Sequence, residues 1–317
     1  MVNNRFYSKI LISGEYIIFQ RAKALAVPYK NYSGKLDFIT DKSIHDKLEN
    51  HSNKVFQDLN KYFDKTLSGS VLTNKFKLGK FNNDINNGLY FNSNIHEGYG
   101  IGSSGALTAA IYNNYVNNRE YFFNNEFHNK ILLNLKNELA YIESFFHGKS
   151  SGIDALVSYV NKPLLINRNS IEVTNYKIEK KPQLTILLID TGQTRNTQDL
   201  INRFNNEIEN KKLFKLLENG LIPASNSFTD ALIENNIPGI FKNLQKISEF
   251  QFDNFRLLIV PEFLNFWEQG LKSGKYFLKL CGSGSGGYLL GLINDFEYFN
   301  NVVNLNFPSI NYEIVNC

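Results

Sequence analysis

The stretch GYGIGSSGAL, residues 98–107, decides most about the fold of this chain of 317 residues. Glycine stands at every second position from 98 to 102, and a Ser-Ser-Gly sequence then leads into the apolar run of a predicted helix, residues 106–115. Glycines let several backbone N–H groups point into one concavity, and the first N–H groups of a helix have no partner within the helix. The stretch therefore predicts an anion-binding loop, most simply for phosphate. Its candidate binding residues are Gly98, Gly100, Gly102, Ser103, Ser104 and Gly105.

Two other interpretations of this loop stay open from the residues alone. Residues 100–105 also match the G-x-G-x-x-G pattern of dinucleotide-binding proteins, but that motif follows a buried strand and precedes an acidic ribose ligand by about 20 positions. The preceding segment NSNIHE is polar, and Glu120 is followed by no convincing buried strand. A plain glycine turn that caps a helix is the other interpretation. The sequence GKS at 148–150 is excluded as a P-loop, because its leading position is Glu143 instead of glycine.

Composition places the chain among globular proteins and excludes several functional classes. Hydrophobic residues make up 43% and charged residues 20%, which is the balance of a folded chain. The net charge of +4 is spread along the sequence, so no basic patch indicates nucleic acid binding. Cys281 and Cys317 can form neither a disulfide framework nor a four-thiolate zinc site. Gly14-Glu15 interrupts the apolar start of the chain, and no apolar run approaches about 18 residues, so we expect a cytoplasmic protein without membrane segments.

Hydrophobic periodicity predicts strands and helices in both halves of the chain. The clearest helix covers residues 126–146, where apolar residues recur at three- and four-residue steps. Other helices are expected at residues 42–62, 197–217, 225–249 and 261–270. Strands are expected at residues 9–19 (with a bend at the Gly-Glu pair), 36–40, 76–81, 164–166, 171–176, 184–189, 276–280 and 288–292. The charged segment EKKP at 179–182 is the expected domain boundary, dividing the chain into residues 1–182 and 183–317.

Three charged residues are candidates for phosphoryl-transfer chemistry. Glu143 lies near the end of the long predicted helix, and Asp154 follows eleven positions later, across the turn HGKSSG. Such chemistry needs a carboxylate that holds Mg²⁺, and often a second that orients or deprotonates the nucleophile. The third candidate is Lys9, just before an apolar strand. Each also has a structural interpretation: Glu143 as a solvated helix end, Asp154 as a helix cap and Lys9 as the start of a strand.

A second glycine-rich segment, CGSGSGG at residues 281–287, follows the predicted strand 276–280. Four glycines among these seven residues indicate that another backbone or a ligand approaches closely. A flexible hairpin is the alternative, although a hairpin needs only two glycines.

Three of these segments together resemble the motifs of the GHMP small-molecule kinases, which include galactokinases, homoserine kinases, mevalonate kinases and phosphomevalonate kinases. KILISGEY at 9–16, continued by ALAVP at 24–28, resembles the N-terminal motif of the family. Residues 98–106 resemble its glycine-serine ATP loop, and KLCGSGSGG at 279–287 resembles its C-terminal glycine motif. The resemblance spans nearly the whole chain and implies an α+β GHMP kinase fold with two lobes. The N-terminal lobe would be an α/β domain like ribosomal S5 domain 2, and the C-terminal lobe would be ferredoxin-like.

Two further segments are similar to those of mevalonate kinases within this family. They are E-x-x-x-HG-x-x-SGID at 143–154 and DTG-x-x-RNT at 190–197. The resemblance implies that Lys9 lies beside the reacting hydroxyl and that Asp154 is the catalytic carboxylate. It implies that Ser104 and Glu143 hold Mg²⁺ while the glycine loop binds the phosphates of ATP. It also implies acceptor contacts from Tyr16, His147, Ser151, Thr197 and Gly282.

The sequence departs from the mevalonate kinase pattern at two places. Tyr16 stands where mevalonate kinases usually have histidine, while Ser283 and Ser285 stand where alanine or glycine is commoner. Tyr16 and residues 99–105 are more similar to phosphomevalonate kinases. The acceptor is therefore less tightly specified by the sequence than the phosphoryl transfer.

The expected function is the ATP- and Mg²⁺-dependent phosphorylation of a primary alcohol, with mevalonate, converted to 5-phosphomevalonate in isoprenoid precursor synthesis, as the favoured acceptor. The alternatives within the family are a phosphomevalonate kinase or another sugar or amino-acid kinase. The alternatives from other classes are a nicotinamide-binding oxidoreductase and an inactive GHMP-fold binding protein. Expected partners are ATP and a small-molecule alcohol, without nucleic acid or membrane, and a homodimer stays open.

Overall fold

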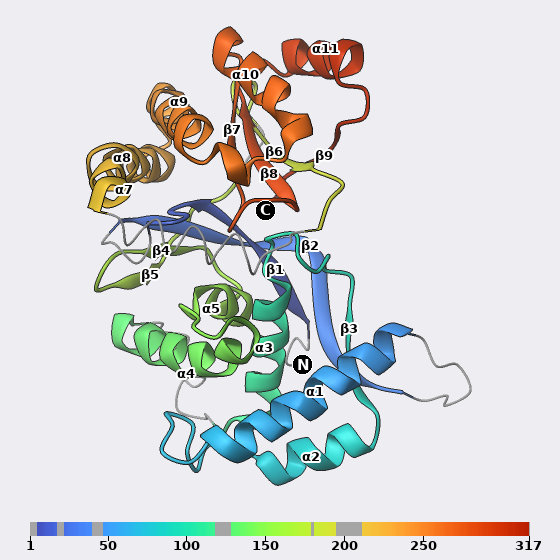
Figure 1. Ribbon diagram of the computed structural model, residues 1–317. Helices are drawn as coiled ribbons and strands as arrows, with labels where there is room; N and C mark the ends of the chain where they lie inside the picture. Colours follow the sequence, from blue (N-terminus) through green and yellow to red (C-terminus); the bar gives the residue numbers. More distant parts are fainter. Residues whose placement is uncertain are drawn as a thin grey trace.

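The computed structural model describes residues 5–17, 22–39, 47–117, 128–178, 181–194 and 211–316. Figure 1 shows two lobes, each built from one sheet and its helices. The five-stranded sheet has the order β1-β2-β4-β5, with β3 also paired to β2, and every pairing is antiparallel. Its strands are β1 (Phe6–Ser13), β2 (Ala24–Phe38), β3 (Leu89–Ser93), β4 (Leu164–Ile166) and β5 (Ile171–Val173).

The second sheet has four antiparallel strands in the order β7-β8-β6-β9. They are β6 (Thr185–Asp190), β7 (Tyr276–Leu280), β8 (Tyr288–Ile293) and β9 (Asn311–Ile314). Every residue of β7 and β8 is buried, which explains why their sequences, apart from Lys279, lack polar residues at alternate positions. The helices of this lobe are α7 (Lys211–Leu216), which continues through a π-helical turn (Leu217–Leu221), α8 (Ile222–Ile233), α9 (Ile237–Asn254), α10 (Leu264–Ser273) and α11 (Phe296–Asn306).

The helices of the N-terminal lobe pack on one face of the five-stranded sheet, and the C-terminal lobe lies on the other (Figure 1). They are α1 (Lys47–Thr66), α2 (Leu78–Asn86), α3 (Ser103–Tyr115), α4 (Asn129–His147) and α5 (Ile153–Val160). Alternate residues of β2 follow this division. Ala24 and Ala26 belong to the core beneath the helices, whereas Leu25 and Val27 belong to the core shared with the C-terminal lobe.

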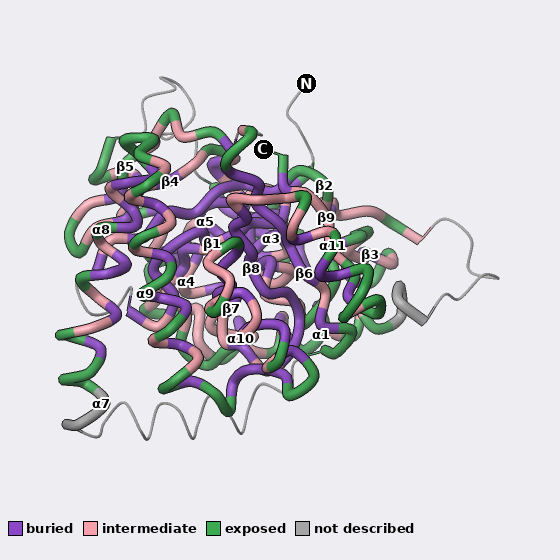
Figure 2. Tube along the Cα trace, turned by 90° about the horizontal axis from the view of Figure 1, so that it is seen from above, coloured by how far each residue is buried: buried purple, intermediate pink, exposed green. Residues whose placement is uncertain are grey.

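Buried residues run through the centre of the molecule, as Figure 2 shows. One hydrophobic core includes Ile10 of β1 together with Ile189 and Leu289 of the second sheet, so it crosses from lobe to lobe. Polar contacts cross the same interface. Ser13 Oγ lies 2.7 Å from Thr229 Oγ1, and Lys23 Nζ lies 2.5 Å from Asp230 Oδ1. The two lobes are therefore held in one arrangement by apolar and polar contacts.

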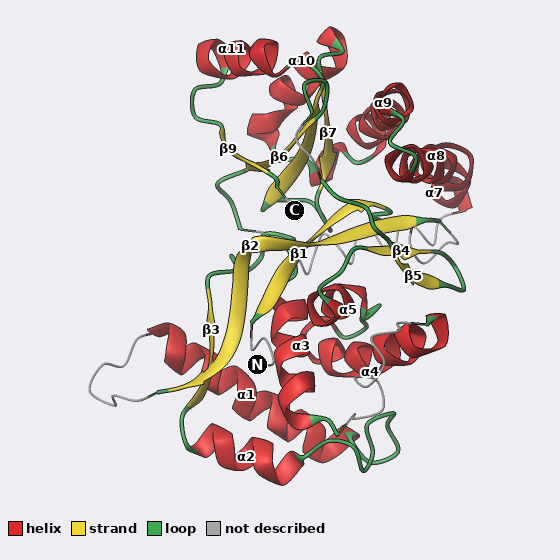
Figure 3. Ribbon diagram, turned by 180° about the vertical axis from the view of Figure 1, so that it is seen from behind, coloured by secondary structure: helices red, strands yellow, loops and turns green. Residues whose placement is uncertain are grey.

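Most of the elements predicted within the described residues occur, and the prediction of an α+β fold is confirmed (Figure 3). The helix predicted at 197–217 lies outside the described residues except for its last part, α7. The strand predicted at 76–81 is wrong, because Phe81 and Ile85 lie four positions apart on the buried side of helix α2. The single helix predicted at 225–249 is two helices, α8 and α9. They are separated at residues 234–236, where Asn235 has a left-handed φ of 56°, and Pro238 stands in the first turn of the next helix.

The predicted boundary between the lobes lies in a short turn around residues 181–184. All strands of the first sheet precede this turn and all strands of the second follow it, which supports our proposal of lobes covering residues 1–182 and 183–317. The specific lobe folds, S5-like and ferredoxin-like, stay predictions. None of the described helices is long and apolar enough to cross a bilayer.

Candidate functional site

The glycine loop leads directly into helix α3. Gly98, Gly100 and Gly102 have φ values of 76°, 79° and 81°, the left-handed region in which a residue with a side chain is disfavoured. Gly102 is the N-cap of α3, and no side chain caps the helix there. The N–H groups of the first turn and the positive end of the helix dipole are thus left for a bound anion.

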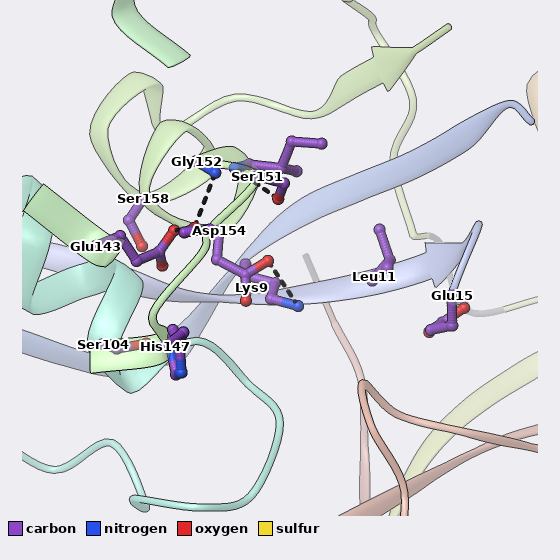
Figure 4. Close-up of polar contacts among 12 residues, drawn as sticks. Lys9, Leu11, Glu15, Ser104, Glu143, His147, Ser151, Gly152, Asp154 and Ser158 are labelled. Carbon is purple, nitrogen blue, oxygen red and sulfur yellow. Dashed lines mark hydrogen bonds and ion pairs between the residues drawn. The ribbon is translucent and has the colours of Figure 1, made fainter. Parts of the chain in front are cut away.

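Lys9 projects from β1 onto this loop. Its backbone N–H donates to the carbonyl of Ile101 at 2.8 Å, which joins the strand to the loop. A Cβ atom added at Gly102 would lie 2.9 Å from Cγ of Lys9, so the loop passes too close for a side chain. The ammonium Nζ lies 3.0 Å from Oδ1 of Asp154, and Lys9 is only 3% exposed while the Asp154 side chain is 36% exposed (Figure 4).

Asp154 stands in the first turn of α5, after the left-handed N-cap Gly152. The positive end of the helix dipole favours a carboxylate at this place. Helix α3 brings the glycine loop to it, because Gly105 packs against the backbone of Asp154. A Cβ at Gly105 would lie 2.8 Å from that backbone. Asp154 therefore pairs with Lys9, and no side chain caps α5. The alternative interpretation of Asp154 as a helix cap is wrong.

Glu143 is a buried carboxylate on the last turns of α4, not a solvated helix end. Its side chain accepts a hydrogen bond from the Ser150 hydroxyl, which also accepts the N–H of Gly152 at 3.0 Å. The pKa of Glu143 is raised to about 8, mainly by burial and also by the negative charge of Asp154, against the opposing effects of Ser150 and Lys9. Two neighbouring carboxylates share one lysine, so a further cation would offset the remaining negative charge when both are ionised.

The residues fit a magnesium ion that is also bound to phosphate oxygens. Within the described ranges, no group of three or more His, Cys, Asp or Glu side chains could hold a metal alone. Magnesium on a nucleotide needs only one or two protein oxygens, since phosphates and water supply the others. The Glu143 carboxylate and the Ser104 hydroxyl are hard oxygen donors of this kind, and Ser104 lies in the first turn of α3.

A cavity of about 750 Å³ opens beside the glycine loop. Gly98, Ser103, Ser104 and His147 form its polar wall. The rest of its lining includes apolar and aromatic side chains, and such a mixture of polar and apolar walls is typical of small-molecule sites. These are Val55, Phe91, Ile95, Leu107 and Phe146. The cavity thus joins a phosphate-type loop to a surface that suits a planar base.

The C-terminal glycine segment packs against the first glycine loop. A Cβ at Gly287 would lie 2.6 Å from the backbone of Tyr99, and the N–H of Tyr288 donates to the Tyr99 carbonyl at 3.2 Å. The close approach that its glycines predict is therefore an approach of one loop to the other, and not the freedom of an isolated hairpin.

Comparisons with known proteins agree with this geometry. Residues 61–162 match the model of the family described as GHMP kinases N terminal domain. Over this range the chain is similar to the N-terminal domain of the GHMP kinases. The resemblance that the motifs indicated is thereby confirmed, and the matched range contains the glycine loop, Glu143 and Asp154.

Solved structures of GHMP kinases share the fold over the whole chain. L. major mevalonate kinase in complex with R-mevalonate is 14% identical with a TM-score of 0.61, covering 100% of this chain and 96% of its own. Lactococcus lactis galactokinase with galactose is 13% identical with a TM-score of 0.62, covering 99% and 93%. Streptococcus pneumoniae phosphomevalonate kinase with phosphomevalonate and AMPPNP is 13% identical with a TM-score of 0.61, covering 99% and 100%. No curated protein sequence matches the chain.

The predicted acceptor residues of this GHMP kinase-like chain are placed less uniformly. Tyr16 has a left-handed φ of 68°, and its ring packs against Phe255 at 4.8 Å between centroids. Ser151 accepts the N–H of Ile153 at 3.3 Å, at the start of α5. Gly282 begins the C-terminal glycine segment with a φ of 61°. Thr197, with the rest of the segment 195–197, lies outside the described residues. The structure brings Lys9, Asp154, Glu143 and the glycine loop together, and it places His147 in the cavity wall beside Ser104.

Sequence reasoning missed two features of the site. One is Ser150, whose hydroxyl binds Glu143 and shapes the turn before α5. The other is a buried ion pair between Lys279 and Glu15, whose side chains are 1% and 3% exposed. The signal for the pair was present, since each residue is a charge inside an otherwise apolar part of a glycine motif. No local sequence pattern, however, predicts that Lys279 pairs with Glu15.

Proposed function

We propose that this chain is an ATP- and Mg²⁺-dependent kinase that phosphorylates the primary alcohol of a small molecule. The single observation that carries the proposal is the ion pair between Lys9 and Asp154, 3.0 Å long, beside a glycine loop at the start of a helix. The ion pair and the loop together bring a base, a cation and a phosphate-binding backbone to one place. Positioning and neutralisation of charge account for most of the catalysis in phosphoryl transfer.

Asp154 and Lys9 would act on the acceptor hydroxyl. An alcohol is a poor nucleophile at neutral pH, and the partly exposed Asp154 carboxylate can accept its proton as the transfer proceeds. Lys9 would stabilise both that carboxylate and the negative charge that develops on the acceptor oxygen. Alternatively, Asp154 only orients the hydroxyl and the proton leaves late, which a loose transition state allows. Both routes need the same contact between these two residues.

The glycine loop and two oxygen ligands would hold the nucleotide. The N–H groups at the start of α3 would bind phosphate oxygens, and the base would enter the cavity beside the loop. Ser104 and Glu143 would hold Mg²⁺, which supplies positive charge to the phosphates when bound. In this arrangement Glu143 has a reason to be charged in spite of its burial, since a cation offsets both desolvation and repulsion by Asp154.

Mevalonate is the acceptor that we favour. The segment at 143–154, which carries Glu143 and Asp154, is similar to that of mevalonate kinases, and so is DTG-x-x-RNT at 190–197. The fold of L. major mevalonate kinase, solved with R-mevalonate, covers the whole chain. Phosphorylation of mevalonate would place the enzyme in isoprenoid precursor synthesis.

Phosphomevalonate is the second candidate. Tyr16 and residues 99–105 are more similar to phosphomevalonate kinases than to mevalonate kinases. The S. pneumoniae enzyme of that kind also has the fold of the whole chain, with the same TM-score of 0.61. The two candidates differ by one phosphate on the acceptor, so a direct comparison of substrates separates them.

An acceptor screen tests the proposal. ADP release is measured with the purified chain, Mg²⁺·ATP and each of mevalonate, phosphomevalonate, homoserine and galactose. We expect turnover with mevalonate and little with the others. Faster turnover with phosphomevalonate would transfer the assignment to the second candidate. No ADP release with any acceptor, together with binding of NADH but not ATP, would replace the kinase by an oxidoreductase.

A further inference from the structure

His147 is the last residue of α4, and its ring reaches the glycine loop. Its Nε2 atom lies 2.9 Å from Oγ of Ser104, and both residues line the cavity beside the loop (Figure 4). Glu143 lies four positions earlier on the same helix, which puts the two side chains on one face. A single turn of α4 thus carries a carboxylate close to Asp154 and Lys9 and an imidazole at the start of α3.

The hydroxyl of Ser104 has one hydrogen and two lone pairs. When such an oxygen binds a metal ion, a lone pair must face the metal, and the hydrogen must be donated elsewhere. An unprotonated Nε2 accepts this hydrogen, with the other ring nitrogen carrying the proton of the neutral imidazole. In this tautomer, the contact between His147 and Ser104 would orient the hydroxyl so that its lone pair is free for a cation.

We propose that His147 is a positioning residue for the nucleotide-bound Mg²⁺ and not an acceptor contact. It acts through Ser104, by accepting the hydroxyl hydrogen and holding the oxygen toward the metal. This inference rests on the proposed function, and it goes beyond it in naming the residue that orients the metal ligand. It also reassigns His147 from the acceptor side of the site to the nucleotide side.

Direct binding measurements test the inference without relying on turnover. A non-hydrolysable ATP analogue is titrated by calorimetry into the full chain, with Mg²⁺ and with EDTA. We expect His147→Leu to weaken binding in Mg²⁺ by about 10-fold or more, the usual effect of losing a partner of a metal ligand, and to leave binding in EDTA unchanged. His147→Gln, whose amide oxygen can accept the same hydrogen, should recover part of the affinity.

A double-variant comparison isolates the path through Ser104. In the Ser104→Ala background, we expect His147→Leu to cause no further loss, because the oriented hydroxyl is already absent. His128→Ala, at the other end of the same helix, controls for general weakening of α4 and should leave both titrations unchanged.

Three outcomes would overturn the inference. A loss that persists in EDTA, or that adds fully to Ser104→Ala, would show that His147 does not act through the hydroxyl. A higher KM for the acceptor with unchanged binding of the nucleotide would return His147 to the acceptor side. Failure of the wild-type chain to bind the analogue at all would instead refute the proposed function, so the two failures are distinguishable.

Discussion

At the scale of single residues, the site contains charged side chains whose burial is unfavourable when they are unpaired and is offset when they lie together. Lys9 is 3% exposed, and a buried ammonium group is stable only when it is paired. Asp154 supplies that pairing and remains accessible on its other side, so one contact serves both folding and chemistry. Glu143, by contrast, is buried beside another carboxylate, and its charge is favoured only when a cation is bound.

Asp154→Asn is expected to lower kcat by about 100-fold or more, because a positioned acid-base group contributes on this order. Steady-state ADP release with saturating ATP and acceptor measures the loss. A thermal melt of the variant verifies that it is folded. Turnover near that of the wild type would remove Asp154 from the catalytic role.

Glu143→Gln is expected to raise the Mg²⁺ concentration needed for half-maximal activity, because an amide oxygen binds a hard cation less well than a carboxylate. Titration of activity with MgCl₂ at fixed ATP measures the shift. Glu138→Gln on the same helix is the matched control, since Glu138 is also buried but is paired with Lys75 away from the loop. An identical titration for wild type and Glu143→Gln would show that the metal ligand is another residue.

The same carboxyl predicts a dependence of stability on pH in the metal-free protein. The pKa of Glu143 is about 8 when folded, against 4.5 in a solvated glutamate, so the folded state binds the proton more tightly. This stabilisation is complete below about pH 4.5 and is lost as the pH rises toward about 8. Urea unfolding in EDTA should therefore show wild type losing stability relative to Glu143→Gln between these values. A difference that stays constant across the range would contradict the assignment.

At the scale of elements, the active geometry depends on how closely α3 and α5 approach each other. Gly105 at the start of α3 touches the backbone of Asp154, and Gly152 before α5 lies against the carbonyl of Lys136 on α4. These two glycines let the starts of α3 and α5 approach each other and the middle of α4, where charged side chains converge. The role of Gly105 is steric, whereas Gly152 is required by both the close contact and its left-handed φ of 74°.

Gly105→Ala is expected to separate α3 from α5, because the new Cβ would lie 2.8 Å from the backbone of Asp154. Overpacking of this kind costs about 1–3 kcal/mol and should move Asp154 away from Lys9, lowering kcat as well. Urea unfolding and ADP release measure the two effects. Gly79→Ala in helix α2 is the control, since no atom lies within 4 Å of its added Cβ. It should leave kcat unchanged and keep or slightly raise stability.

At the scale of the whole molecule, a buried ion pair joins the two lobes close to the site. Lys279 of β7 binds Glu15, in the turn after β1, and also donates to the carbonyls of Leu11 at 3.3 Å and Leu280 at 3.1 Å. Leu11 stands two positions after Lys9 on the same strand. The pair therefore fixes the strand that carries the catalytic lysine against the C-terminal lobe.

Lys279→Met is expected to lower the free energy of unfolding by about 3–5 kcal/mol, because it leaves Glu15 buried without its cation. Lys279→Met combined with Glu15→Gln should recover part of that loss, since no unpaired charge then remains. Lys272→Met breaks an exposed pair with Glu268 and should cost no more than about 1 kcal/mol. Equal effects of Lys279→Met and Lys272→Met in urea unfolding would show that the buried pair contributes nothing special.

The sequence by itself determined those features whose cause is local. Glycines at 98, 100 and 102 permit the left-handed backbone that the loop adopts, and the apolar steps along 126–146 favour a helix wherever a core can bury them. The identity of the reactive side chains was equally visible, because their chemistry belongs to the residue type. Local pattern predicts a strand at 76–81, whereas most of this segment lies in helix α2.

Only the tertiary structure decided which of these residues meet. Lys9 and Asp154, Ser104 and His147, and Lys279 and Glu15 come from separate elements, and each contact exists because sheets and helices pack at particular distances. Bringing residues so far apart in the sequence together costs chain entropy, and local interactions do not offset it. The pairing is therefore fixed by the packing of the whole core. For the same reason the charge state of Glu143 follows from its burial, which a sequence pattern does not contain.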